Sequence, residues 1–451
     1  MIKTTIQHKR LVGSHLRFDP SFYFRHTDIQ KLLIDEDTRL VELADLVDEV
    51  RGEARVQSSG DSIPLVRLSD LHLCELNPRR LQSIDADSSQ SFTRAYPGDV
   101  LFARSTVPFR AAVVPANTPT PLVVSSEITV IRLRGAVVPE YLAALLSTGA
   151  YGKVLQDLSY RRSPTAVPRL RLHDIYHLPI PLPGRQLQEE IRTAYNLATR
   201  LSQESQEDIS SIVRSVHAEI DAKISHVQPF HDVFNVQRAK LGNRWDVSYA
   251  KGRILHNILA QTRVMVPLLS LAHPVPSSLR GIAEDDLVLV IKADDINEYS
   301  FMVERPQSIM LKDLSPRMRQ PLSVGDVLIC TTGQGEQVAF LDDTLASMGL
   351  PLLGSATFTA LRFSETPRFY AVALTHPIVR NQIQLLSSGT VQRFVNKKDL
   401  DELLVPNLGQ IWREDFELRI ERAIERRREA LAALDNLLET AQRFAQEGWQ
   451  S

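Results

Sequence analysis

The sequence predicts an α+β protein that is built twice over, with a long helix at the end of each half. The tetrapeptide Gly-Asp-Val-Leu occurs at 98–101 and again at 325–328, each time opening an apolar run typical of a strand. Each half then ends in a stretch that is poor in Gly and Pro and has apolar residues at helical spacing. At 451 residues the chain is also longer than one ordinary domain.

Other pairs of segments recur in the same order and at nearly the same spacing as the two Gly-Asp pairs. They are Arg17–Phe22 with Arg244–Tyr249, Val66–Leu71 with Ile291–Ile296, Ile131–Leu133 with Leu361–Phe363, and Arg171–Pro181 with Asn396–Pro406. An ordered set of this kind is the signature of an internal repeat. We interpret the chain as a tandem duplication.

Short apolar runs separated by Pro, Gly and Asp lie between these landmarks and predict strands in both halves. One short helix is expected from Pro139 to about Asp157, and one from Phe369 to about Leu386. The pattern predicts a first globular domain at 1–183, and a linker with a second globular domain at 227–407.

The segments 184–226 and 408–451 are the predicted long helices. Apolar residues recur at three-and-four spacing in both, as in coiled coils. They are Leu187, Ile191, Ala194, Ala198, Leu201, Ile209, Ile212, Val216 and Ile220 in the first, and Phe416, Ile420, Ile424, Leu431, Leu434, Leu438 and Ala441 in the second. One such helix could pack on its own domain, but two at equivalent places favour pairing with each other.

Composition sets wide limits on function. The net charge of −2 does not announce a nucleic-acid binder and does not exclude one, because clustering of positive charge matters more than its total. No apolar run is long enough for a membrane span, and the N-terminus lacks the pattern of a signal peptide. Cys74 and Cys330 lie in or beside apolar runs, which favours buried thiols. We therefore expect a cytoplasmic protein.

Motifs of catalysis are missing from the sequence. It has no phosphate-binding loop with a lysine, no His-Glu-x-x-His, and no Cys-x-x-Cys metal spacing. The Asn/Asp-Pro-Pro-Tyr tetrapeptide of adenine methyltransferases is absent as well, the nearest segment being Asn77-Pro78-Arg79. We expect a non-catalytic chain without a metal site or a bound cofactor.

The ordered landmarks nevertheless resemble a known family. A Gly-Asp-Val-Leu strand, Pro-Glu-Tyr-Leu opening a helix at 139–142, an Asp-Ile followed by Leu-Pro-Ile-Pro-Leu-Pro at 178–183, and a long helix after it, repeated once, are similar to specificity subunits of type I restriction–modification systems. The resemblance covers nearly the whole chain.

This resemblance implies two target recognition domains and an antiparallel coiled-coil spacer made by the two long helices. Each domain would read one part of a bipartite, asymmetric target in double-stranded DNA. Adenine methyltransferase subunits would bind around the helices and carry the S-adenosylmethionine, and a motor-nuclease subunit could join them. The chain itself would be the DNA-recognition subunit, not the enzyme.

Two loops in each half hold the predicted DNA-binding residues, chosen because base and phosphate contacts need basic, amide or hydroxyl side chains. The first half supplies Arg104, Ser105, Thr106, Arg110, Tyr160, Arg161 and Arg162, and the second supplies Thr331, Thr332, Gln334, Ser388, Thr390, Gln392, Arg393, Lys397 and Lys398. Equivalent positions differ in chemistry, as expected of domains that read different sequences. For any one arginine, a solvated surface charge is an equal alternative.

Three further points stay open at the level of sequence. For Arg17/Asp19 and Arg244/Asp246, an internal ion pair is favoured over DNA contact. Thr332-Gly333 follows the second Gly-Asp strand, as in the family, whereas the first half has Thr106-Val107, so the first loop can differ in shape. An adaptor of another anti-phage or nucleic-acid-processing complex is the alternative function, and a stand-alone methyltransferase or nuclease is a third.

Overall fold

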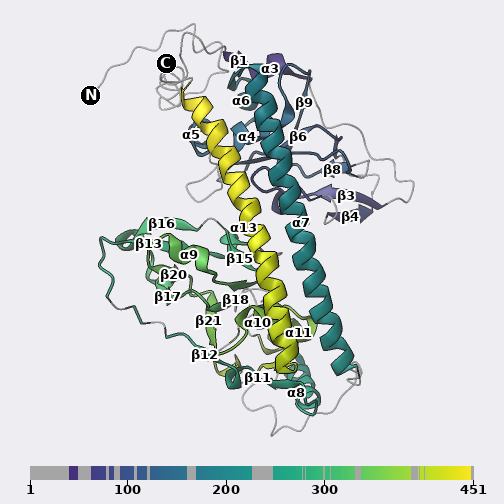
Figure 1. Cartoon of the computed structure of the whole chain (residues 1–451), viewed down its shortest axis with the longest axis vertical. Coiled ribbons are helices and arrows are strands. Elements are labelled where there is room, and N and C mark those ends of the chain that lie inside the picture. The colour runs from purple at the N-terminus through teal and green to yellow at the C-terminus, as the bar shows by residue number, and fades with distance from the viewer. Residues whose placement is uncertain are drawn as a thin grey trace. The chain divides into compact units, whose positions relative to one another are not determined.

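The structure is a computed structural model of the whole chain (Figure 1). It describes residues 40–48, 62–77, 81–85, 92–105, 109–118, 122–159, 169–225, 247–276, 278–279, 281–297, 300–304, 306–330, 337–387, 395, 397–400 and 402–447. Within these ranges, no helix combines the length and the apolar character that crossing a membrane requires.

The chain forms two compact units, and each long helix belongs partly to both. Unit 1 comprises Met1–Gln203 and Arg428–Ser451, and unit 2 comprises Glu204–Arg427. Helix α7 (Arg185–Ile224) therefore begins in unit 1 and ends in unit 2, whereas α13 (Gln410–Glu447) begins in unit 2 and ends in unit 1. The domain limits expected from the sequence, which set the helices apart, stay a prediction.

Unit 1 contains two four-stranded sheets and one two-stranded pair. The first sheet has the order β2-β9-β6-β7, the second β4-β3-β8-β5, and β1 pairs with β10. The strands are β1 (Leu40–Glu42), β2 (Val47–Asp48), β3 (Ser62–Val66), β4 (Gln82–Asp85), β5 (Thr93–Ala95), β6 (Val100–Ala103), β7 (Arg110–Val113), β8 (Leu122–Val124), β9 (Ile128–Leu133) and β10 (Pro179–Pro181).

Unit 2 contains a six-stranded sheet, a four-stranded sheet and one two-stranded pair. The orders are β12-β21-β18-β19-β15-β14 and β16-β13-β20-β17, and β11 pairs with β22. The strands are β11 (Met265–Pro267), β12 (Ala272–Pro274), β13 (Leu287–Ile291), β14 (Ile296–Asn297), β15 (Met302–Val303), β16 (Gln307–Met310), β17 (Gln320–Leu322), β18 (Val327–Cys330), β19 (Val338–Phe340), β20 (Leu352–Gly354), β21 (Phe358–Phe363) and β22 (Leu404–Pro406).

The two units share one strand order. The sheet β2-β9-β6-β7 has its counterpart in β12-β21-β18-β19, which unit 2 extends by β15 and β14, and β4-β3-β8-β5 has its counterpart in β16-β13-β20-β17. Even the one parallel pair of the second sheet recurs, as β3 with β8 and as β13 with β20. Each landmark segment that the structure describes thus has the same place in both units.

The Gly-Asp pairs begin equivalent strands in an equivalent way. Gly98 and Gly325 each have φ of +88°, a backbone conformation that favours glycine. The following aspartate accepts a hydrogen bond from a backbone N–H three residues earlier, at 2.8 Å in both units. Its two carboxylate oxygens also accept from an arginine of the neighbouring strand, with Arg132 bound to Asp99 and Arg362 to Asp326. This ion pair joins β6 to β9 and β18 to β21.

The expectation of one short helix at 139–157 and one at 369–386 is wrong, because each of these segments forms two helices. Unit 1 has α4 (Pro139–Ser147) and α5 (Gly149–Leu158), and unit 2 has α10 (Pro367–Leu374) and α11 (Pro377–Leu386). Thr148 is extended and its hydroxyl accepts from the N–H of Tyr151. Pro377 lacks an N–H and disfavours helix in the residue before it, so the second break follows from the sequence.

Each of the remaining helices lies within one unit. They are α3 (Leu43–Leu46), α6 (Leu172–Tyr176), α8 (Val247–Leu259), α9 (Asp343–Ser347) and α12 (Lys397–Leu400), with 3₁₀ turns η1 (Leu68–Asp70), η4 (Leu268–Ser270), η5 (Ala293–Asp295), η6 (Leu311–Asp313) and η7 (Pro316–Met318). Buried tyrosines connect helix to strand: Tyr141 of α4 donates to the carbonyl of Pro181, and Tyr151 of α5 donates to that of Pro179.

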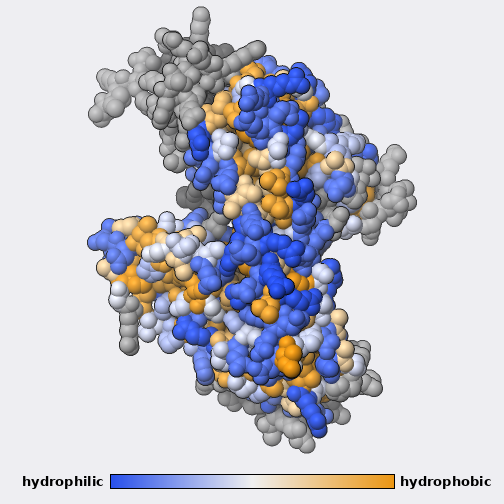
Figure 2. Space-filling view, viewed as in Figure 1, coloured by the Kyte–Doolittle hydropathy of each residue, from blue (hydrophilic) through white to orange (hydrophobic). Residues whose placement is uncertain are grey.

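Both long helices contribute to the core of each unit. In unit 1 the core joins Ile191, Tyr195 and Ala198 of α7 to Leu434, Leu437 and Ala441 of α13. In unit 2 it joins Ile209, Ile212, Val216, Ile220 and Ile224 to Phe416, Ile420, Ala423 and Ile424. The buried residues continue the predicted apolar stripes, and in Figure 2 hydrophilic residues prevail along the exposed side of α13.

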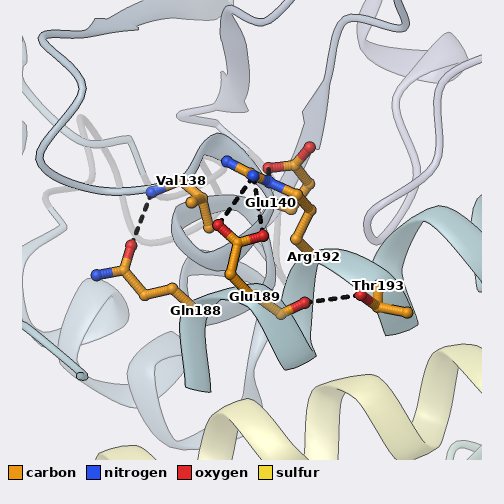
Figure 3. A network of polar contacts seen from close by, with 6 residues as sticks. All are labelled: Val138, Glu140, Gln188, Glu189, Arg192 and Thr193. Carbon is orange, nitrogen blue, oxygen red and sulfur yellow. Dashed lines mark hydrogen bonds and ion pairs between the residues drawn. The ribbon is translucent and has the colours of Figure 1, made fainter. Parts of the chain in front are cut away.

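The start of each long helix is fixed to its unit by polar contacts whose charges are reversed between the units. In unit 1, Gln188 of α7 accepts from the N–H of Val138, and Arg192 pairs with Glu140 of α4 at 3.6 Å (Figure 3). In unit 2, Glu417 of α13 pairs with Arg368 of α10 at 3.2 Å and accepts from its backbone N–H. Glu417 also accepts from the N–H of Phe369.

Candidate nucleic-acid interface

The polar loops of unit 1 meet at one end of its sheets. Strands β3, β6 and β8 end there, and β4, β7 and β9 begin there, because Leu65 pairs with Gln82 and Ala103 pairs with both Arg110 and Ile128. The N–H of Ser125, in the turn between β8 and β9, donates to the carbonyl of Val66. We call this end, with Arg67, Arg104, Ser105, Glu127 and Arg169, the loop end of unit 1. The Gly-Asp turn lies at the opposite end of β6.

The carboxylate of Glu127 lies between the cations Arg104 and Arg169 of this loop end. Its carboxylate accepts from the hydroxyl of Ser105 and pairs with Arg169. Burial raises the pKa of Glu127, but hydrogen bonds from Ser105 and Arg169 and the charges of Arg169 and Arg104 outweigh it, so that the pKa is lowered. Arg104 also donates to the carbonyl of Ser126, at 2.5 Å. Two guanidinium groups thus surround one ionised carboxylate, which leaves an excess of positive charge.

Of the residues predicted from sequence, the structure brings Arg104 and Ser105 together at this end. Arg110 begins β7, and its guanidinium donates to the carbonyl of Leu71 at 3.4 Å. Lys397 and Lys398 begin α12, and only their backbone is described. Outside the described residues lie Thr106, Tyr160, Arg161, Arg162, Thr331, Thr332, Gln334, Ser388, Thr390, Gln392 and Arg393, together with the predicted ion pairs Arg17/Asp19 and Arg244/Asp246.

Unit 2 has a loop end at the equivalent place. The N–H of Ser355, in the turn between β20 and β21, donates to the carbonyl of Ile291, where β13 ends. Gln337 follows the predicted loop after β18, and its amide donates to the carbonyl of Ala293 at 3.4 Å. Thr357 takes the place that Glu127 has in unit 1, and its hydroxyl donates to that of Ser355. The charged cluster of unit 1 is therefore replaced by hydroxyls at this turn.

Sequence reasoning missed several polar residues of the loop ends. Glu127 and Arg169 were missed because they reach Ser105 only in the folded chain, through the pairing of β9 with β6 and the hydrogen bond from the N–H of Leu170 to the carbonyl of Arg104. Arg67 and Lys292 belong to the matched landmarks Val66–Leu71 and Ile291–Ile296, so their recurrence was visible. Their partners Gln82 and Gln307 lie on other strands, and no local pattern points to them.

Among the described residues there is no group of three or more His, Cys, Asp or Glu side chains that could hold a metal ion. The thiols of Cys74 and Cys330 are both buried, as the sequence indicates, and form no disulfide with each other. What the loop ends provide is a set of guanidinium, ammonium, amide and hydroxyl donors, which are the groups that contact phosphates and base edges.

Several solved structures resemble the chain, and three of them follow. One is described as the HsdS subunit from Thermoanaerobacter tengcongensis, with 15% identity and a TM-score of 0.32 over 93% of this chain and 98% of that one. Another is the type I restriction–modification S subunit from M. genitalium, with 13% identity and a TM-score of 0.39 over 91% and 98%. A third comes from work on assembly and conformational transition of a type I R-M system, with 16% identity and a TM-score of 0.31 over 92% and 97%. No family model and no curated protein matches the chain.

Proposed function

We propose that the chain is the sequence-recognition subunit of a type I restriction–modification complex and that its two units arose by tandem duplication. The observation that carries this proposal is the pair of loop ends. They occupy the same place in one shared strand order, yet their side chains differ, with Glu127 in unit 1 and Thr357 in unit 2. A common scaffold with unlike donor sets is what reading two unlike DNA half-sites requires.

In this proposal each unit reads one part of a split, asymmetric target, and the long helices serve as an antiparallel coiled-coil spacer between the two readers. The sharing of apolar residues between α7 and α13 in each core supports the pairing of the helices. Half-site spacing in DNA-binding proteins that read two half-sites follows from such protein geometry.

The chain itself would catalyse no reaction. Adenine methyltransferase subunits, which carry S-adenosylmethionine, would bind around the long helices, and a motor-nuclease subunit would complete a restricting complex. The sequence resemblance supports these partners.

Mapping of modified adenines in the host genome, with and without this gene, tests the proposal. We expect a split, asymmetric motif to lose its methylation when the gene is deleted and to regain it on complementation. A methyltransferase partner that keeps its full sequence specificity without this chain would contradict the proposal.

The second candidate is an adaptor of another anti-phage or nucleic-acid-processing complex. The near-neutral net charge of −2 is compatible with it, and Thr106-Val107 in place of the Thr-Gly of the family after the first Gly-Asp strand favours it. An unchanged pattern of adenine methylation after deletion, together with partners other than a methyltransferase in co-purification, would support the adaptor.

A further inference from the structure

A cation held by a glutamine recurs at the loop ends of both units. In unit 1 the guanidinium of Arg67 donates to the side-chain carbonyl of Gln82 at 2.6 Å. In unit 2 the ammonium of Lys292 donates to the side-chain carbonyl of Gln307 at 2.9 Å. Each cation follows the last residue of the equivalent strand, β3 or β13, and each glutamine begins the antiparallel neighbour, β4 or β16.

The backbone beneath each cation is held in the same way. The N–H of Arg67 donates to Asp70 at 2.7 Å, and that of Lys292 donates to Asp295 at 2.8 Å. These aspartates fold the chain into η1 and η5, so that the position of the cation's backbone is set by a local turn. Arg67 and Lys292 are therefore both positioned directly after the end of a strand, next to the turns that contain Ser125 and Ser355.

Folding alone gives no reason for this arrangement to recur. Arg67, Gln82 and Gln307 are exposed, and Lys292 is half-buried. Within the described ranges, the side chain of each cation is bound to the neutral amide of its glutamine and not to a carboxylate. A side-chain hydrogen bond at the surface contributes only about 0.5–1.5 kcal/mol, because water competes for both groups. The glutamine orients the head group of the cation, and the carboxylate of Asp70 or Asp295 is bound at the backbone N–H of the same residue.

What the two half-sites of a split target have in common is the phosphate backbone. Side chains that read bases must differ between the units, as Glu127 and Thr357 do, whereas phosphate contacts carry no sequence information and can be the same. Arg and Lys are both suited to phosphate, and exchange between them retains the charge.

We infer that Arg67 with Gln82 and Lys292 with Gln307 are a matched pair of DNA phosphate contacts, one in each unit. The inference rests on the proposed DNA-binding function. Each cation binds a phosphate oxygen of its own half-site, and its glutamine holds it in place. The two contacts position the units on the duplex, and the other residues of the loop ends read the sequence.

Binding of the full-length chain to a duplex of arbitrary sequence, and to a duplex with the mapped target, tests this inference over a range of salt concentrations. Each of the variants Arg67→Ala and Lys292→Ala should weaken binding to both duplexes equally. Each should also lower the slope of log affinity against log salt by about 0.9, the value for one phosphate contact. The double variant should lower the slope by about twice that amount. Arg67→Lys should retain the wild-type slope.

Two control variants remove an equal charge elsewhere in the same units. Arg134 pairs with Asp48 at the far end of β9, and Lys312 pairs with Asp285 beyond the far end of β16. Alanine at either position should leave the slope unchanged. A wild-type slope in the Arg67 and Lys292 variants, or a loss of discrimination between the duplexes without a change of slope, would overturn the inference while the DNA-binding function stands. A wild-type chain without affinity for either duplex would overturn both.

Discussion

At the scale of single residues, Gly98 and Gly325 show how one backbone conformation sets the start of a strand. Both have φ of +88°, and a β-carbon added at either position would meet no atom within 4 Å. The cost of a side chain there is therefore conformational and not steric, since the left-handed region is unfavourable for L-residues by about 1–2 kcal/mol.

We predict that Gly98→Ala and Gly325→Ala each lower the free energy of unfolding by about 1 kcal/mol. Gly184 and Gly409, which precede the long helices, are matched controls, because they have equal space for a β-carbon and no positive φ. Denaturant titration of the four variants measures the difference. Equal stability of all four would show that the turn does not need glycine.

Residue patterns explain what the sequence could and could not predict. The Gly-Asp pairs and the apolar runs after them were sufficient to predict β6 and β18, because turn chemistry is local. The partners Arg132 and Arg362 of the two aspartates could not be chosen, since strand register brings them there. The break at Pro377 had a local signal, whereas the break at Thr148 depends on a hydroxyl that can also lie within a helix.

At the scale of elements, the ion pairs between short and long helices have opposite polarity in the two units. Glu140 lies on α4 and Arg192 on α7, but Arg368 lies on α10 and Glu417 on α13. Like charges facing each other would oppose docking, so each long helix is matched in charge to its own short helix.

We predict that Glu140→Arg destabilises unit 1 and that Glu140→Arg with Arg192→Glu restores part of the loss, with a coupling of about 0.5–1 kcal/mol, because Arg192 is partly exposed and also pairs with Glu189. The corresponding exchange of Arg368 and Glu417 should restore less, because Glu417 also accepts from the N–H of Phe369 and an arginine cannot. Double-mutant cycles in urea provide the comparison. Equal recovery of stability in both units would argue against a contribution from the hydrogen bond between Glu417 and the N–H of Phe369.

The contact between His217 and His376 makes the stability of unit 2 depend on pH. His217 of α7 lies with its ring 4.9 Å from that of His376, between α10 and α11, and its Nε2 is 3.1 Å from the hydroxyl of Thr375. Burial and then the neighbouring His376 lower the pKa of His217 to about 4, and burial lowers that of His376. Asp221 and Arg380 are the nearby charges.

Because the folded pKa of His217 lies below the unfolded value of about 6.5, its contribution to stability is complete above pH 6.5. It is lost as the pH falls from there toward 4, since the unfolded chain then binds the additional proton. We predict that His217→Gln loses less stability than the wild-type protein over this range. Unfolding titrations at several pH values check this, and parallel losses in the two proteins would contradict it.

At the scale of the whole molecule, the proposed function together with one strand order and unlike loop ends predicts that each unit reads its half-site independently. Substitution of Arg104 or Ser105 in unit 1 should change the bases accepted in one half of the split motif and leave the other half intact. Mapping of modified adenines in cells with each variant measures this. Altered bases in both halves would show that the units do not read separately.

The division of α7 and α13 between the units has a consequence for how the protein comes into being. Residues 428–447 of α13 supply Leu434, Leu437 and Ala441 to the core of unit 1, although the ribosome makes them after the whole of unit 2. Unit 1 is thus synthesised first, but its core is completed last. Its apolar core residues stay exposed to solvent until residues 428–447 have been made. Nascent chains of this protein should therefore depend on chaperones until the final helix emerges.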